Sequence, residues 1–251
     1  MDDPGDRGSA PPTAPERMAD TDDTRTLAVA ERLVAALPTP WVGRVLAGGA
    51  AIVALRLWWS TSALGPRLVR DLVIFVALPG LLAVRYGGDI GWRVDRTAVR
   101  DATLLAAFVA PFYVVGSTLP TVRAYYPAWR TTLALGEFLP HAVGLVLVAF
   151  AAETYYRGLL CVGLRELGPG CVLVSPVVYT LMHTGKPPVE LLLAGPTDVL
   201  FGAVDYNSGS VLPSTVAHGA GFVLLDYLVL RDPVIPPDRV LASLRWLPVP
   251  L

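Results

Sequence analysis

The sequence AAETYYRGLL, residues 151–160, places a glutamate and an arginine inside a run that is otherwise apolar enough to lie in hydrocarbon. An ionisable group at membrane depth is costly and usually persists only for a function or a partner. Glu153 and Arg157 are four residues apart, so on an α-helix they lie on one face and can pair directly. The pair is interpreted either as a buried structural ion pair or as part of a polar site.

The composition indicates that this stretch belongs to a membrane protein. The 251 residues are 53% hydrophobic and 16% charged, with a mean hydropathy of +0.53, which lies outside the range of soluble domains. The formal net charge of −1 offers no basic surface for nucleic acid. We therefore expect a multi-pass protein of the cell membrane whose partner is the lipid bilayer, with no nucleic-acid partner.

Hydrophobic stretches recur along the chain, each close to the ~20 residues that a spanning helix needs. They cover residues 42–64, 69–85, 103–119, 132–163, 170–183, 188–204 and 209–230. The sequence thus predicts an all-α fold, a polytopic membrane helix bundle of about seven helices. The stretches at 170–183 and 188–204 are short and bounded by prolines, so tilted, re-entrant or kinked helices are open alternatives there.

Four segments are expected along the chain. They are a disordered N-terminal tail (1–25), amphipathic and transmembrane helices (26–130), a core bundle with a polar cavity (131–230) and a C-terminal tail (231–251). Within the second segment, residues 26–37 have the apolar spacing of an amphipathic helix on the membrane surface. Residues 85–101 carry four arginines, which predicts a cytoplasmic loop.

The histidines of the chain all lie in its C-terminal half, at positions 141, 183 and 218. YTLMH (179–183) and HGAGF (218–222) follow ETYYRG on later apolar stretches. A hydrogen bond within the bundle is the simpler interpretation of either histidine alone. The ordered set instead favours a water-filled site, where glutamate acts as base and histidine orients water or stabilises an oxyanion. The candidate catalytic residues are Glu153, Arg157, His183 and His218.

The order E-x-x-x-R-G, aromatic-x-x-x-H and a late histidine resembles the CPBP/Abi family of type II CAAX prenyl endopeptidases and bacteriocin-processing relatives. The resemblance covers residues 80–230. DIGWRVDR (89–96) is similar to the amphipathic linker that often precedes the core helices, and HTGKPPVE (183–190) to a segment of some prokaryotic members. It implies a CAAX-protease-like fold, peptide-bond hydrolysis by Glu/His-activated water, a peptide or prenylated protein substrate and no cofactor.

Two positions depart from the pattern of that family. Its first motif has two adjacent glutamates, of which the first is understood to activate the attacking water, and Ala152 occupies that position here. Its third motif has an asparagine four residues after the histidine, where this chain has Phe222. Asp226, further along the same stretch, is a candidate partial replacement for the amide.

Three outcomes remain open for the chemistry. Glu153 takes over as base, another carboxylate (Glu190 or Asp198) supplies the missing group, or hydrolysis is lost and the protein acts in membrane binding or regulation. With one glutamate committed to Arg157, the sequence predicts weak or no cleavage of prenylated CAAX peptides. It also predicts that Ala152→Glu raises activity, while Glu153→Gln mainly costs stability.

Other classes fit the sequence less well. A zinc protease would need H-E-x-x-H, which is absent, although Glu153, His183 and His218 could supply three ligands if they converged. A small-solute transporter could use midplane Asp and His groups, but no inverted repeat is visible. The remaining polar or reactive groups have structural interpretations: Tyr155 and Tyr156 as membrane-interface aromatics, and Cys161 and Cys171 as small core residues.

Overall fold

The computed structural model of the protein describes residues 37–251, so the predicted tail and nearly all of the predicted amphipathic helix lie outside the described residues. Within residues 37–251 the chain is built of helices, without a strand. Each of the seven predicted hydrophobic stretches contains a helix. The predicted all-α helix bundle is confirmed.

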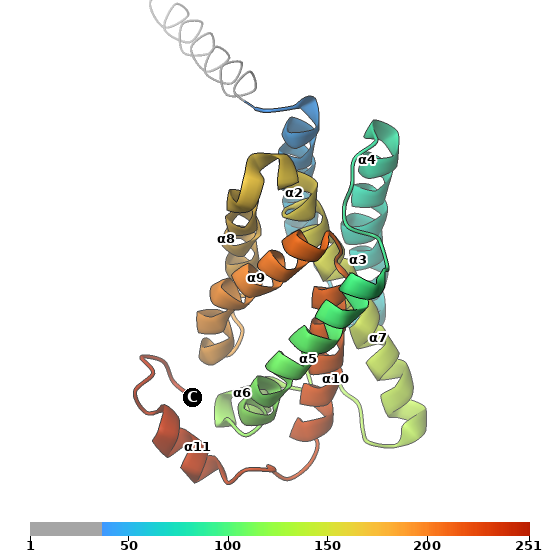
Figure 1. Ribbon diagram of the computed structural model, residues 1–251. Coiled ribbons are helices and arrows are strands. Elements are labelled where there is room, and N and C mark those ends of the chain that lie inside the picture. Colours follow the sequence, from blue (N-terminus) through green and yellow to red (C-terminus); the bar gives the residue numbers. More distant parts are fainter. Residues whose placement is uncertain (1–36) are drawn as a thin grey trace, which may run out of the picture.

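The helices follow one another with short connections (Figure 1). Two of them change pitch without a break, because π-helical turns continue α3 into α4 and extend α7 at its C-terminal end. The elements are α2 Pro40–Trp58, α3 Leu64–Asp71, η1 Leu72–Ala77, α4 Leu78–Tyr86, α5 Arg96–Gly116, α6 Pro120–Tyr125, α7 Leu135–Glu153, η2 Thr154–Leu159, η3 Val162–Leu173, α8 Val174–Leu181, α9 Pro188–Ser208, α10 Leu212–Val229 and α11 Pro237–Leu244.

Four helices in the described residues are long and apolar enough to cross a membrane: α2, α5, α7 with its π-helical extension, and α10. α5 shows the apolar face that such a helix needs, because Leu104, Phe108 and Phe112 recur every four residues and are all exposed. A row of exposed leucine and phenylalanine side chains is stable against lipid rather than water. The chain is therefore a membrane protein.

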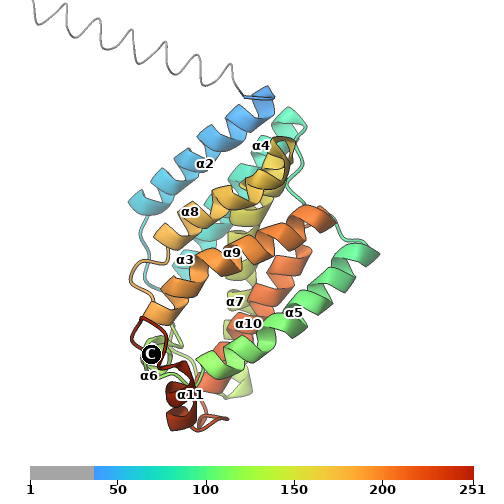
Figure 2. The ribbon, with the colours of Figure 1, turned by 60° about the vertical axis from the view of Figure 1, so that its left-hand side comes forward.

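α10 lies at the centre of the C-terminal half, in contact with α5, α7 and α9 (Figure 2). Glycines allow the close crossings. A Cβ atom on Gly219 would lie 3.6 Å from Val146 of α7, and one on Gly221 would lie 2.0 Å from the Tyr113 ring of α5. The helix that carries HGAGF is thus packed on both sides through its small residues.

Tyr155 and Tyr156 lie in the protein core, not at the membrane interface. Their residues are 1% and 6% exposed. Tyr155 stacks on Phe75 with ring centroids 4.9 Å apart, and its hydroxyl donates to the Gly49 carbonyl oxygen at 2.9 Å. The interface interpretation is wrong because η2 lies against α2 and η1, so its side chains pack between helices. Cys161 and Cys171 are fully buried and unbonded to each other, as expected of small core residues.

The segment 89–96 has no amphipathic helix before α5. Residues 89–95 form an irregular loop, where the Gly91 carbonyl oxygen accepts a hydrogen bond from Val211 N–H at 3.0 Å and Trp92 donates to Thr154 at 3.1 Å. Gly158 makes the close approach of this loop possible, because a Cβ atom there would lie 2.8 Å from the Ile90 carbonyl oxygen. The glycine of the E-x-x-x-R-G motif therefore serves packing.

Candidate active site

Glu153 is the last residue of α7, and Arg157 follows within the π-helical turn. Arg157 Nε lies 3.0 Å from Glu153 Oε2, and both side chains are fully buried. The predicted inward orientation and direct pairing are confirmed. A π-helical turn widens the helix locally and is frequent at functional sites, and here all six of its residues are buried.

Asp198 of α9 supplies a second carboxylate to Arg157. Its Oδ1 lies 2.9 Å from Arg157 Nη2, so one guanidinium joins α7 to α9. The guanidinium also lies over the Tyr179 ring, 4.4 Å from its centroid. The N–H groups of the Arg157 guanidinium do not have hydrogen-bond geometry toward the two carboxylates. These contacts are therefore ion pairs rather than hydrogen bonds.

His218 of α10 binds the other oxygen of the same glutamate. Its Nδ1 lies 2.5 Å from Glu153 Oε1. An ionised carboxylate only accepts, so Nδ1 carries the hydrogen and donates it. The opposite ring atom, Nε2, is left for other partners.

His183, in the turn after α8, has the same anchoring through a different partner. Its Nδ1 lies 2.7 Å from the Tyr179 carbonyl oxygen. A carbonyl oxygen only accepts, so Nδ1 carries the hydrogen, and in the neutral ring Nε2 is an acceptor. Burial, reinforced by the charge of Lys186, lowers the pKa of His183 to about 4, so the ring is neutral at physiological pH.

Glu190, in the first turn of α9, faces His183. Its Oε1 lies 3.8 Å from His183 Nε2, too far for a direct hydrogen bond. Lys186 Nζ donates to Oε1 at 2.6 Å and the Tyr126 hydroxyl donates to Oε2 at 2.7 Å. The carboxylate is thus fixed in place from two sides.

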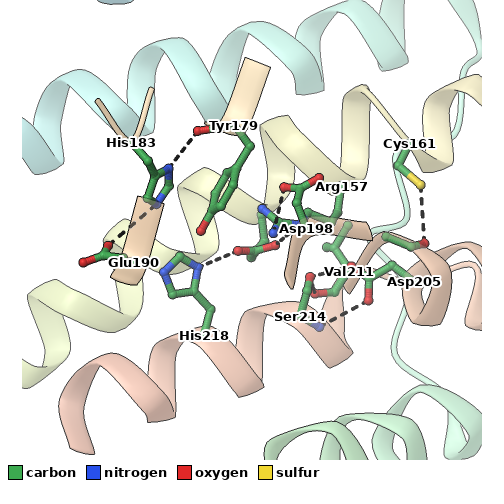
Figure 3. A network of polar contacts seen from close by, with 12 residues as sticks. Arg157, Cys161, Tyr179, His183, Glu190, Asp198, Asp205, Val211, Ser214 and His218 are labelled. Carbon is green, nitrogen blue, oxygen red and sulfur yellow. Dashed lines mark hydrogen bonds and ion pairs between the residues drawn. The ribbon is translucent and has the colours of Figure 1, made fainter. Parts of the chain in front are cut away.

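These groups form one polar row through the bundle (Figure 3). Its members are Glu190, His183, His218, Glu153, Arg157 and Asp198. One end is sealed, because Glu153, Arg157 and Asp198 have side-chain exposures of 0%, 0% and 1%. The other end is open, with 14% exposure for His183, 25% for Glu190 and 20% for His218. The two histidines and Glu190 therefore lie at the accessible end of the row.

The candidate replacement for the missing amide does not reach the site. Asp226 Oδ2 lies 2.7 Å from His141 Nε2 and is committed to that pair. Phe222 instead stacks on His218, with ring centroids 5.8 Å apart and planes at 15°. It also meets the Tyr126 ring edge-on, so an aromatic wall stands where an amide was expected.

Tyr126 and Lys186 are the site groups that the sequence reasoning missed. Lys186 lies four residues before Glu190, in the bend that precedes α9, and this spacing was a usable signal for their pairing. Tyr126 carries no comparable signal, because it precedes Glu190 by 64 residues and reaches it only through the fold. Within residues 37–251, no group of three His, Cys, Asp or Glu side chains is arranged to hold a metal ion.

Comparison with known proteins adds one family. Residues 134–222 match the family model described as type II CAAX prenyl endopeptidase Rce1-like. The matched segment contains every member of the polar row, and the family resemblance predicted from the motifs is confirmed. The match supports a CAAX-type intramembrane endopeptidase in general. No curated protein and no solved structure matches the chain significantly.

Proposed function

We propose that the protein is a multi-pass endopeptidase of the cell membrane that hydrolyses peptide bonds with water activated at the open end of the polar row. One observation carries the proposal. His183 and His218 come from separate helices, each is anchored through Nδ1, and both lie at the end of the row that solvent can reach.

The two histidines suit different halves of the reaction. His218 binds the Glu153 carboxylate through Nδ1, so Nε2 is left for the substrate, and in the doubly protonated ring Nε2–H donates to the oxygen of the scissile carbonyl. His183 is neutral, so its Nε2 can accept a hydrogen from the attacking water. Arg157 touches neither reactant, since it is sealed behind Glu153, and it positions that carboxylate.

The proposed substrate is a peptide or protein with a prenylated CAAX terminus. Support comes from the description of the matching family and from the apolar helices around the site. A lipid-modified terminus partitions into the bilayer, which brings the adjacent peptide bond to a site between membrane helices.

A second candidate function is supported by a separate observation. Ala152 stands where the resembling family has its water-activating glutamate, and Glu153 is held by Arg157 and His218. If no other carboxylate replaces it, the protein binds prenylated termini without cleaving them and acts as a membrane regulatory partner. Cleavage and binding therefore have to be measured separately.

The test uses the full chain reconstituted in proteoliposomes. A fluorescence-quenched farnesylated CAAX peptide is the substrate, and the same peptide without the farnesyl group is the control. We expect cleavage of the farnesylated peptide and a loss of about 10²-fold or more in His183→Ala and His218→Ala. The exposed Glu137→Gln variant, at the far end of α7, should retain full activity.

Three results would count against the proposal in different ways. Saturable binding of the farnesylated peptide without cleavage would establish the regulatory function instead. Cleavage that survives loss of both histidines would place the reaction outside the polar row. Ion-coupled uptake of a small solute, measured in the same vesicles, would favour a transporter.

A further inference from the structure

We propose that Glu190 is a catalytic residue of this site, the carboxylate that takes the proton from the attacking water opposite His183. The inference rests on the proposed endopeptidase function, and it assigns a role to one of the two carboxylates that the sequence offered as a replacement for the missing group. It answers the question raised by Ala152, which leaves the site without a glutamate at the expected position.

Glu153 is poorly suited to act as the base. Its side chain has no exposed area, one oxygen binds His218 at 2.5 Å, and the other lies 3.0 Å from Arg157. A water molecule would have to displace one of these partners to reach it. Asp198 is excluded by the same argument, because it is 1% exposed and lies on the far side of Arg157.

Glu190 meets the geometric requirements that Glu153 fails. It is a quarter exposed, and its Oε1 lies 3.8 Å from His183 Nε2. Nε2 is an acceptor in the neutral ring, and the carboxylate is also an acceptor, so the two groups cannot bond each other. A water molecule that donates one hydrogen to each would satisfy both, with its oxygen lone pair free to attack.

The surroundings of Glu190 hold it in this orientation without exhausting it. Lys186 donates to Oε1 and Tyr126 donates to Oε2, while Lys186 also donates to the Tyr126 hydroxyl at 2.9 Å. Each carboxylate oxygen has two acceptor positions, so Oε1 keeps one for water. Such a double anchor limits rotamer freedom and preorganises the base.

The step balances with water as the only co-reactant. The water oxygen forms a bond to the carbonyl carbon as one O–H bond breaks, and that proton passes to Glu190. The carbonyl π pair moves onto oxygen, where His218 Nε2–H donates to it. When the tetrahedral carbon collapses, the C–N bond breaks and Glu190 returns the proton to the leaving nitrogen. The products are a carboxylic acid and an amine.

The first variant is Glu190→Gln in the full chain, assayed on the farnesylated peptide. Glutamine keeps the shape and an oxygen acceptor for Lys186, but it cannot take a proton. We expect kcat to fall by about 10²-fold or more, with KM and the thermal midpoint close to wild type. Glu137→Gln is the matched control and should leave kcat unchanged.

Glu190→Asp separates catalysis from the pairing with Lys186. Aspartate keeps the charge but withdraws the carboxylate by one methylene from His183. A catalytic carboxylate predicts at least a tenfold loss of kcat at unchanged stability. Adding Ala152→Glu to Glu190→Gln should recover part of the lost kcat, because the site then regains an ionisable carboxylate.

The possible outcomes separate the role of Glu190 from the proposed endopeptidase function. Wild-type kcat in both Glu190 variants, with His183→Ala inactive, would overturn the role of Glu190 and leave the endopeptidase intact. A lowered thermal midpoint that accounts for the whole loss in both variants would show Glu190 to be structural. Absence of cleavage by the wild-type protein would remove the proposed function and the role of Glu190 together.

Discussion

His141 and Asp226 form a buried pair that joins α7 to α10, with 2.7 Å between Nε2 and Oδ2. The exposed fractions are 6% for His141 and 0% for Asp226. The third histidine of the chain is therefore structural, and Asp226 cannot assist His218. The three histidines divide into one that packs helices and two that face the open end of the site.

His141→Ala should lower stability and leave the activity of the folded protein unchanged. Removing one partner leaves the Asp226 carboxylate buried without a donor, which costs roughly 1–3 kcal/mol. Unfolding in detergent measures the loss, and kcat per folded molecule is compared with that of His183→Ala. A fall in kcat without a change in unfolding would assign His141 to the reaction instead.

Glu153→Gln should mainly destabilise the protein. Glu153 is the partner of both Arg157 and His218, and breaking a buried ion pair by removing one member costs about 3–5 kcal/mol. Chemical unfolding of the variant measures this cost. Adding Arg157→Met should then cost less than the sum of the two single changes, as a double-mutant cycle reports for coupled groups. Full stability with abolished kcat would identify Glu153 as the base.

Ala152→Glu alone should raise the rate of cleavage. The residue precedes Glu153, so its side chain points about 100° further round α7 and is only partly buried. Two neighbouring carboxylates repel each other when both are ionised. One of the two glutamates at positions 152 and 153 would therefore bind a proton more readily than a single glutamate does. The kcat of the variant is compared with that of Ala152→Gln, which adds the volume without the charge. Equal rates in the two variants would contradict this expectation.

The stability of the protein should depend on His183 between about pH 4 and 6.5. Its pKa is lowered to about 4 in the folded protein by burial and by Lys186, whereas an unfolded chain titrates near 6.5. The unfolded state therefore binds more protons in this window, and stability falls as the pH falls, by at most about 1.4 kcal/mol per unit. Thermal midpoints across this range should fall less steeply for His183→Gln than for wild type. Parallel slopes would contradict the low pKa.

Two glycines of one helical segment should respond oppositely to alanine. A Cβ atom at Gly158 would lie 2.8 Å from the Ile90 carbonyl oxygen, whereas one at Gly136 meets no atom within 4 Å. Gly158→Ala should therefore cost about 1–3 kcal/mol. Gly136→Ala should gain up to about 1 kcal/mol from helix propensity. Unfolding in detergent compares the pair, and equal effects would mean that the 89–96 loop yields freely.

The fold was predictable because membrane-length apolar runs can be read from sequence. All seven runs became helices, and α8 is short, as its flanking Pro169 and Pro187 indicated. The pitch changes were not predictable, because a π-helical turn such as 154–159 depends on packing against other helices. The same turn explains the error over Tyr155 and Tyr156, whose sequence is equally compatible with an interface.

The site was predictable where spacing along one helix fixed it. Glu153 and Arg157 pair as their four-residue separation indicated. The contact between His218 and Glu153 was expected only from the order of the motifs, since 65 residues separate them. The placement of Tyr126, the residue after α6, against Glu190 of α9 depends on the tertiary fold, which no local pattern encodes.

The two ends of α9 join the open end of the polar row to the arginine-rich loop. Glu190 lies in its first turn, and at its last residue the Ser208 carbonyl accepts a hydrogen bond from Arg93 of the arginine-rich loop. Glu190 and Ser208 are 18 residues apart on this helix, which separates them by roughly 27 Å. Cysteines placed at positions 93 and 190, labelled from each compartment in turn, would therefore show whether the arginine-rich loop and the open end of the polar row face the same side of the bilayer.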